Sequence, residues 1–140
     1  MCQKDVGVPC EGYFYRVLGV PRPLQRPRFS RNRVYDSQKG EKEEFATLVK
    51  AQHVHDGPFT GPLFLEICFY FPIPTYLSRA KMAALPGTFH DKRPDLSNCI
   101  KFVEDALNEI IYLDDAQISV ICSSKRYSEL PRTEFRIIKL

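Results

Sequence analysis

Acidic and amide side chains gather in one stretch of this sequence, between His90 and Gln117. The stretch begins with His90-Asp91-Lys92-Arg93-Pro94-Asp95-Leu96-Ser97-Asn98 and ends with Leu113-Asp114-Asp115-Ala116-Gln117. Mg²⁺ and Mn²⁺ are hard cations that bind carboxylate and carbonyl oxygens. If the chain returns over the segment between the two groups, Asp115 comes close to Asp95 and both carboxylates can bind one ion. The stretch is therefore a candidate metal site.

Each of these residues also has an ordinary structural explanation. Asp95 or Ser97 can cap a helix, because Asp and Ser side chains accept hydrogen bonds from the free amides of a first turn. The pair Asp114-Asp115 can form a turn. The polar residues between the two groups can be a solvated helix face. Spacing by itself does not distinguish a metal site from these alternatives.

The segment between the two groups has the pattern of a helix. Its apolar residues recur at steps of three and four, at Leu96, Ile100, Val103, Leu107 and Ile110. This spacing predicts a helix over 96–110 with one buried stripe. Three polar residues, Asn98, Lys101 and Asp105, then lie on the opposite side within a strip about one turn wide.

Other elements must hold this helix in place. We expect a strand at 12–20, an extended basic loop at 21–33 whose prolines exclude a helix, a helix at 37–52 and a central strand at 63–72. A short helix at 78–85 and strands at 118–127 and 134–140 follow, and a turn around Pro131 can pair these strands as a hairpin. The order predicts one α+β domain over residues 1–140, with a loose lead-in at residues 1–9. We expect a mixed sheet of about four strands packed by two or three helices.

Composition excludes several classes of protein. The 140 residues are 44% hydrophobic and 26% charged, as in a globular domain. No apolar run approaches the roughly 18 residues of a membrane helix. The net charge of +3 is only mildly basic, but arginines cluster between Arg22 and Arg33, where they can contact phosphate. Five scattered cysteines without a C-x-x-C pair indicate reduced thiols, and no apolar signal core begins the chain, so we expect a cytoplasmic protein.

Several spaced residues resemble the core signature of the RusA family of Holliday junction resolvases. They are Pro94-Asp95-Leu96-Ser97-Asn98, Lys101, Asp105-Ala106-Leu107-Asn108 and Asp114-Asp115-Ala116-Gln117-Ile118. In that family the pattern is Asp-hydrophobic-Asp-Asn, a lysine three residues after the Asn, then Asp-Ala-Leu and a late Asp-Asp-x-Gln. The match runs from about His90 to Tyr127, with weaker agreement at Gly19-Val20-Pro21, Arg26-Pro27-Arg28 and Tyr35.

The resemblance implies a RusA-like fold and a homodimeric endonuclease that depends on Mg²⁺, with Mn²⁺ as a substitute, and uses no nucleotide cofactor. Such an enzyme binds four-way DNA junctions and resolves them by paired symmetric nicks during recombination and repair. By position, the resemblance assigns metal binding to Asp95 and Asp115 and makes Lys101 the catalytic lysine. It gives Asn98 a supporting place in the site.

Ser97 departs from the family pattern, which has a second Asp at this position. A serine hydroxyl is a weak, neutral ligand, so the site loses a negative charge and a strong oxygen donor. Compensation can come from Asp91, Asp105 or Asp114, from His90, or from a carboxylate of a partner subunit. The sequence therefore supports two hypotheses: a nuclease that tolerates Ser97, or a junction-binding protein of the same fold with weak or no cleavage.

Basic residues on both sides of the acidic motif are the expected DNA contacts. They are Arg26, Arg28, His90, Lys92, Arg93, Lys125 and Arg126. A residue that contacts phosphate contributes to affinity without reading the base sequence.

Overall fold

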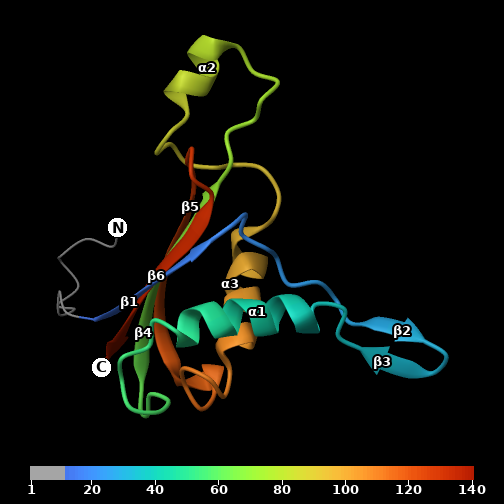
Figure 1. Cartoon of the computed structure of the whole chain (residues 1–140), viewed down its shortest axis with the longest axis vertical. Helices are drawn as coiled ribbons and strands as arrows, with labels where there is room; N and C mark the ends of the chain where they lie inside the picture. Colours follow the sequence, from blue (N-terminus) through green and yellow to red (C-terminus); the bar gives the residue numbers. More distant parts are fainter. Residues whose placement is uncertain (1–11) are drawn as a thin grey trace.

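A computed structural model describes residues 12–140 of the chain, and the predicted lead-in at residues 1–9 lies outside this range (Figure 1). The elements are β1 (Tyr13–Leu18), β2 (Arg28–Ser30), β3 (Arg33–Tyr35), α1 (Lys39–Lys50), β4 (Leu63–Phe71), α2 (Arg79–Ala84), α3 (Leu96–Leu107), β5 (Ile118–Tyr127) and β6 (Arg132–Lys139). A short 3₁₀ turn over Asp115–Gln117 leads into β5. This is the predicted α+β fold.

The main sheet is mixed and has four strands in the order β1-β6-β4-β5. β4 pairs antiparallel with β6 on one side and parallel with β5 on the other. β4 is therefore the central strand that its nearly continuous apolar sequence predicts. Parallel strands need a long crossover connection, and the segment that contains α2 and α3 supplies it between β4 and β5.

The predicted hairpin of the last two strands is wrong. β5 and β6 are neighbours in sequence, but β4 lies between them in the sheet. The reason is burial: alternate residues of β4, such as Leu65, Ile67 and Phe69, are almost fully buried, and a strand with partners on both sides protects them best. Basic residues predicted to form only an extended loop also pair, since β2 and β3 make a separate two-stranded sheet.

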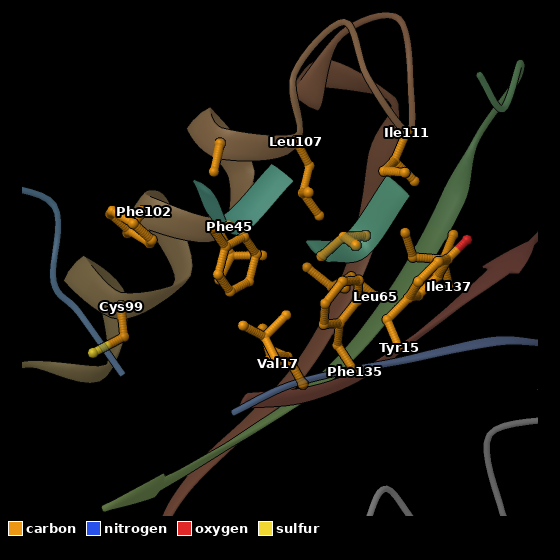
Figure 2. Close-up of a cluster of buried hydrophobic side chains, with 14 of the residues drawn as sticks. Tyr15, Val17, Phe45, Leu65, Cys99, Phe102, Leu107, Ile111, Phe135 and Ile137 are labelled. Carbon is orange, nitrogen blue, oxygen red and sulfur yellow. The ribbon is translucent and has the colours of Figure 1, made fainter. Parts of the chain in front are cut away.

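The core lies between one face of the main sheet and the two longer helices. Figure 2 shows Val17 of β1, Leu65 of β4 and Phe135 of β6 gathered with Phe45 of α1 and Phe102 of α3. The rings of Phe45 and Phe102 meet edge to face at 5.8 Å, which joins the two helices. The packing of α1 against α3 therefore fixes α3 relative to the sheet.

The buried side of α3 differs in part from the predicted stripe. Val103 and Leu107 are buried as expected, but Leu96, Ile100 and Ile110 are only partly buried. The other buried positions are Cys99, Phe102 and Ala106. The helix ends at Leu107 rather than Ile110, because Asn108 is extended and Glu109 has a φ of 65°. The exposed side then carries Ser97, Lys101 and Asp105 in successive turns.

The cysteines agree only in part with the prediction of reduced thiols. Cys68 and Cys99 are free thiols, whereas Cys122 is disulfide-bonded, so the prediction is wrong at that residue. Cys2 and Cys10 lie outside the described residues. Within residues 12–140, no helix has the length and apolar character needed to cross a membrane.

Candidate functional site

Asp95 stands at the start of α3, where its carboxylate is exposed. Its backbone carbonyl accepts hydrogen bonds from the amides of Asn98 at 3.1 Å and Cys99 at 3.2 Å, which begins the helix. Its side chain makes no capping hydrogen bond. Helix capping by the side chain therefore does not explain Asp95, and the carboxylate remains available to a ligand.

Lys125 on β5 holds the loop that leads to Asp95. Its ammonium group donates to the carbonyls of Lys92 at 2.6 Å and Pro94 at 2.8 Å, and its own carbonyl accepts from the amide of His90 at 3.0 Å. The residue predicted as a DNA contact thus uses its charge on the protein itself. Lys125 positions the acidic motif against the sheet.

Replacing Lys125 with Met is expected to lower the free energy of unfolding by about 1–3 kcal/mol, since two charge-assisted hydrogen bonds are lost. Urea unfolding measures the change. Lys139→Met, at an exposed lysine on the last residue of β6, is the matched control and should be nearly neutral. If Lys125→Met leaves stability unchanged but lowers the salt dependence of DNA binding, the Lys125 side chain contacts DNA phosphate and does not hold the loop.

The Asp114 to Gln117 segment is a tightly bonded turn after α3. The Asp114 carboxylate accepts from the Ala116 amide at 3.0 Å, and Gln117 Oε1 accepts from the amides of Leu113 at 2.8 Å and Asp114 at 2.9 Å. Gln117 Nε2 also donates to the carbonyls of Phe59 and Gly61, both at 3.0 Å. Asp114 and Gln117 are therefore structural, and they fix the backbone that presents Asp115.

Asp115 is attached to the end of α3. Its amide donates to Oδ1 of Asn108, the residue that follows the helix, at 3.1 Å. A hydrogen bond with Asp114 raises the pKa of the Asp115 carboxyl, and partial burial and the negative charges of Asp114 and Asp105 raise it further. Asp115 is therefore a carboxylate in a negative environment.

Glu104 belongs to the same environment, although it is not one of the motif residues. Burial raises the pKa of its carboxyl, and the charges of Asp115 and Asp105 add to this, with Lys101 acting in the opposite direction. Helical spacing contained the signal, because Glu104 follows Lys101 by three residues and both therefore lie on one side of α3. Asp105 is exposed and makes an ion pair with Lys42 at 3.5 Å.

The two motif carboxylates, Asp95 and Asp115, lie at opposite ends of α3. The helix has 12 residues, and at about 1.5 Å per residue its two capping residues are roughly 20 Å apart. The chain does not fold back along the helix, so one protomer does not bring Asp115 to Asp95. Among residues 12–140, no three His, Cys, Asp or Glu side chains converge on a point that could hold one metal ion.

The side chains near the Asp95 end differ in exposure. Asp91, Lys92 and Arg93 are exposed in the loop before α3, and Ser97 is exposed on its first turn. Asn98 is half-buried, and its carbonyl accepts from the Leu24 amide at 2.8 Å. Lys92 and Arg93 are thus exposed in the loop that leads to Asp95.

Two other predicted DNA contacts make interactions within the protein. The centroid of the His90 ring lies 4.4 Å from that of Phe71 and 4.8 Å from that of Tyr127. Burial lowers the pKa of His90, and the positive charge of Lys125 lowers it further. Arg126 stacks over Phe89 at 4.3 Å and donates to the carbonyl of Gly87 at 2.8 Å. Arg26 and Arg28 are exposed at the start of the β2–β3 hairpin.

Comparison with known proteins places these residues in a family. Residues 19–138 match the family model described as endodeoxyribonuclease RusA. The chain is also 36% identical over 132 residues to an uncharacterized protein, YqaN, from Bacillus subtilis (strain 168). That alignment covers 88% of this chain and 93% of the relative.

Proposed function

Because the chain belongs to the RusA family of endodeoxyribonucleases, we propose that it is a divalent-metal-dependent nuclease that resolves four-way DNA junctions. The observation that carries the proposal is the placement of Asp115. Its backbone is held by Asn108 and the turn around Gln117, and the charges of Asp115, Glu104 and Asp105 act on one another. Lys42 and Lys101 offset only part of this charge, since the pKa values of Glu104 and Asp115 stay raised. A bound cation would remove the remaining cost to folding.

The side chains at this end of α3 fit Mg²⁺ in chemical type. Mg²⁺ in phosphate-processing sites is held by one or two carboxylates, with water and substrate oxygens in the other positions. Asp115, with Glu104 or Asp105, offers such a set, whereas a closed cage of protein ligands is absent from the described residues. Bound Mg²⁺ supplies stabilisation of the negative charge that develops on a phosphate.

Lys101 is the residue that we propose stabilises the same charge. It is exposed on α3, one turn before Asp105 and three residues before Glu104. Its positive charge acts on the Glu104 carboxyl, so it is felt at the acidic end of the helix. A fixed positive charge next to the reacting phosphate favours the transition state, where negative charge increases.

A homodimer explains how Asp95 enters the site. In a two-fold dimer, residue i of one protomer meets residue j of the other, and j meets i. Two α3 helices that run antiparallel across such an axis bring Asp95 of one protomer to Asp115 of its partner. We propose that each site is composite in this way, which gives two identical sites for paired nicks.

Mixed dimers test the composite site. A dimer of one Asp95→Asn protomer and one Asp115→Asn protomer keeps one intact composite site, so it should nick one strand. If each site is built within a single protomer, both sites of the mixed dimer are damaged and no nick appears. The two pure variant dimers are the controls.

The test of the function compares a synthetic four-way junction with a linear duplex of the same sequence, each with Mg²⁺, Mn²⁺ or EDTA. Symmetric nicks in the junction alone, lost in EDTA, support the nuclease. Tight junction binding without nicks in either metal supports the second candidate, a junction-binding protein. Ser97 favours that alternative, since it removes a motif carboxylate. Failure to bind either DNA at modest salt rejects both.

Mg²⁺ is expected to stabilise the protein more at about pH 7.5 than at about pH 4. The raised pKa values of Glu104 and Asp115 mean that ionisation opposes folding. The stability that the protonated carboxyls contribute is fully present below their ordinary pKa values, 4.5 for Glu104 and 3.8 for Asp115. It is lost as the pH rises through their raised pKa values in the folded protein. Only the ionised carboxylates bind metal.

Thermal unfolding with and without Mg²⁺ measures this effect. At about 100 times its dissociation constant, Mg²⁺ should add about 2.7 kcal/mol near neutral pH. The double variant Glu104→Gln/Asp115→Asn should be more stable than the parent without metal and should lose the response. An equal Mg²⁺ effect at both pH values would mean that these carboxylates do not bind the ion.

A further inference from the structure

The β2–β3 hairpin is a small arm that extends away from the main sheet and the core helices (Figure 1). Its turn contains Arg31 and Asn32 with φ values of 45° and 65°, the left-handed conformation of a tight hairpin turn. All six strand residues are exposed. An isolated two-stranded hairpin is only marginally stable in water, so the arm has surface to bury against a partner.

The two faces of the arm differ in chemistry. Phe29 pairs directly with Val34, and directly paired residues lie on one face. The exposed fractions are 80% for Phe29 and 62% for Val34, so an aromatic ring and a branched side chain stand together in solvent. The opposite face carries Arg28 paired with Tyr35, and Arg33 two residues before Tyr35 on the same strand.

The charge of the arm is positive and uncompensated. Within residues 12–140, no hydrogen bond or ion pair engages the side chains of Arg26, Arg28, Arg31 and Arg33. The nearby carboxylate of Asp36 already pairs with Lys42 at 2.7 Å. A polyanion such as nucleic acid can bind these arginines, because each guanidinium group can make two parallel hydrogen bonds to a phosphate.

We propose that this arm enters the DNA at the point where the strands of the junction part, with Phe29 stacked on a base and Arg28 and Arg33 on phosphates. This inference rests on the proposed function and adds a contact that recognises branched DNA. A two-stranded ribbon fits the major groove of a duplex. Phe29, however, can stack only on a base whose face is not already covered by a neighbouring base, and aromatic rings stack on such bases whatever their sequence. A two-fold pairing of two arms is disfavoured because it would bring like charges together.

Binding of a four-way junction with 2-aminopurine at the branch point tests the arm. The measurement is made in EDTA, so that no strand is cut, with a linear duplex in parallel. Phe29→Ser should weaken junction binding about 10-fold, remove the fluorescence change of the probe and leave duplex binding unchanged. Arg28→Gln and Arg33→Gln should each reduce the salt dependence of binding by about one unit. Tyr76→Ser, at an aromatic residue 84% exposed in another loop, is the matched control and should behave as the parent.

The outcomes separate the arm from the function. If the parent binds the junction and Phe29→Ser matches it in affinity and fluorescence, the arm does not stack on the branch point and the inference is wrong. If Phe29→Ser converts a dimer to a monomer in sedimentation, the arm binds a second copy of the chain, which also overturns the inference. If the parent itself does not bind the junction, the proposed function fails first.

Discussion

Asp115→Asn is expected to lower junction cleavage at least about 100-fold while junction binding is kept. Even residues that only support a metal ligand cost 10–100-fold when replaced, and Asn at this position replaces a carboxylate with a neutral amide. The backbone should stay in place, because the Asp115 amide donates to Asn108 and the neighbouring turn is held by Gln117. Single-turnover cleavage of an end-labelled junction in Mg²⁺ measures the rate. Electrophoretic binding in EDTA measures the affinity.

The matched control for this variant is Asp56→Asn. Asp56 is also an exposed aspartate in a loop, between α1 and β4 and outside the acidic motif. It should cleave at the parent rate. Removing a negative charge beside bound phosphates should, if anything, tighten binding by Asp115→Asn. If Asp115→Asn cleaves as fast as the parent, Asp115 does not bind the metal, and the metal site does not lie at this end of α3.

Ser97→Asp is expected to raise cleavage about 10–100-fold, the range typical of changes around a metal site. The side chain is exposed on the first turn of α3, so the carboxylate is introduced without disturbing the core. A negative charge near a helix N-terminus also favours the helix dipole by about 0.3–1 kcal/mol. Loss of activity in this variant therefore could not be attributed to a weakened fold. Cleavage rates over a range of Mg²⁺ concentrations measure both the rate and the metal affinity.

Ser97→Asn is the control, since Asn has the shape of Asp without its charge. Only Ser97→Asp should gain activity. If the parent binds junctions without cutting and Ser97→Asp cuts them, the parent is the junction-binding protein of the second hypothesis. If both variants equal an active parent, another carboxylate already replaces the missing one, and Glu104 is then the first residue to substitute.

Much of the fold follows from local patterns in the sequence. The apolar spacing in α1 predicted a helix over 37–52, and the structure has it over Lys39–Lys50. The run Leu63–Phe71 indicated a central strand, which it is. What local patterns left open is which strands are neighbours. A turn joins β5 and β6 in sequence, but β4 lies between them in the sheet. This position gives the apolar strand β4 a neighbour along each of its two edges.

The candidate site shows the same division. Residue types and spacing identified Asp95, Lys101 and Asp115, because hard-cation chemistry requires oxygen donors and a motif carries their order. Spacing did not identify Glu104, whose interaction with Asp115 depends on where the loop after α3 lies. It also did not show that Lys125 and His90, both predicted DNA contacts, interact with a loop and with aromatic rings of the protein itself.

The sequence by itself thus determined the family motif, the helices and the acidic residues between His90 and Gln117, because periodicity and residue chemistry are local properties. Only the tertiary structure decided that the chain after α3 does not return along the helix, so that Asp115 lies beside Asn108 and far from Asp95, and that the arginine-rich loop is a protruding hairpin. The path of the chain after α3 depends on bonds to residues distant in sequence, such as those of Gln117 with Phe59 and Gly61, and the hairpin depends on backbone pairing across a tight turn. Neither property can be read from the spacing of residues along the chain.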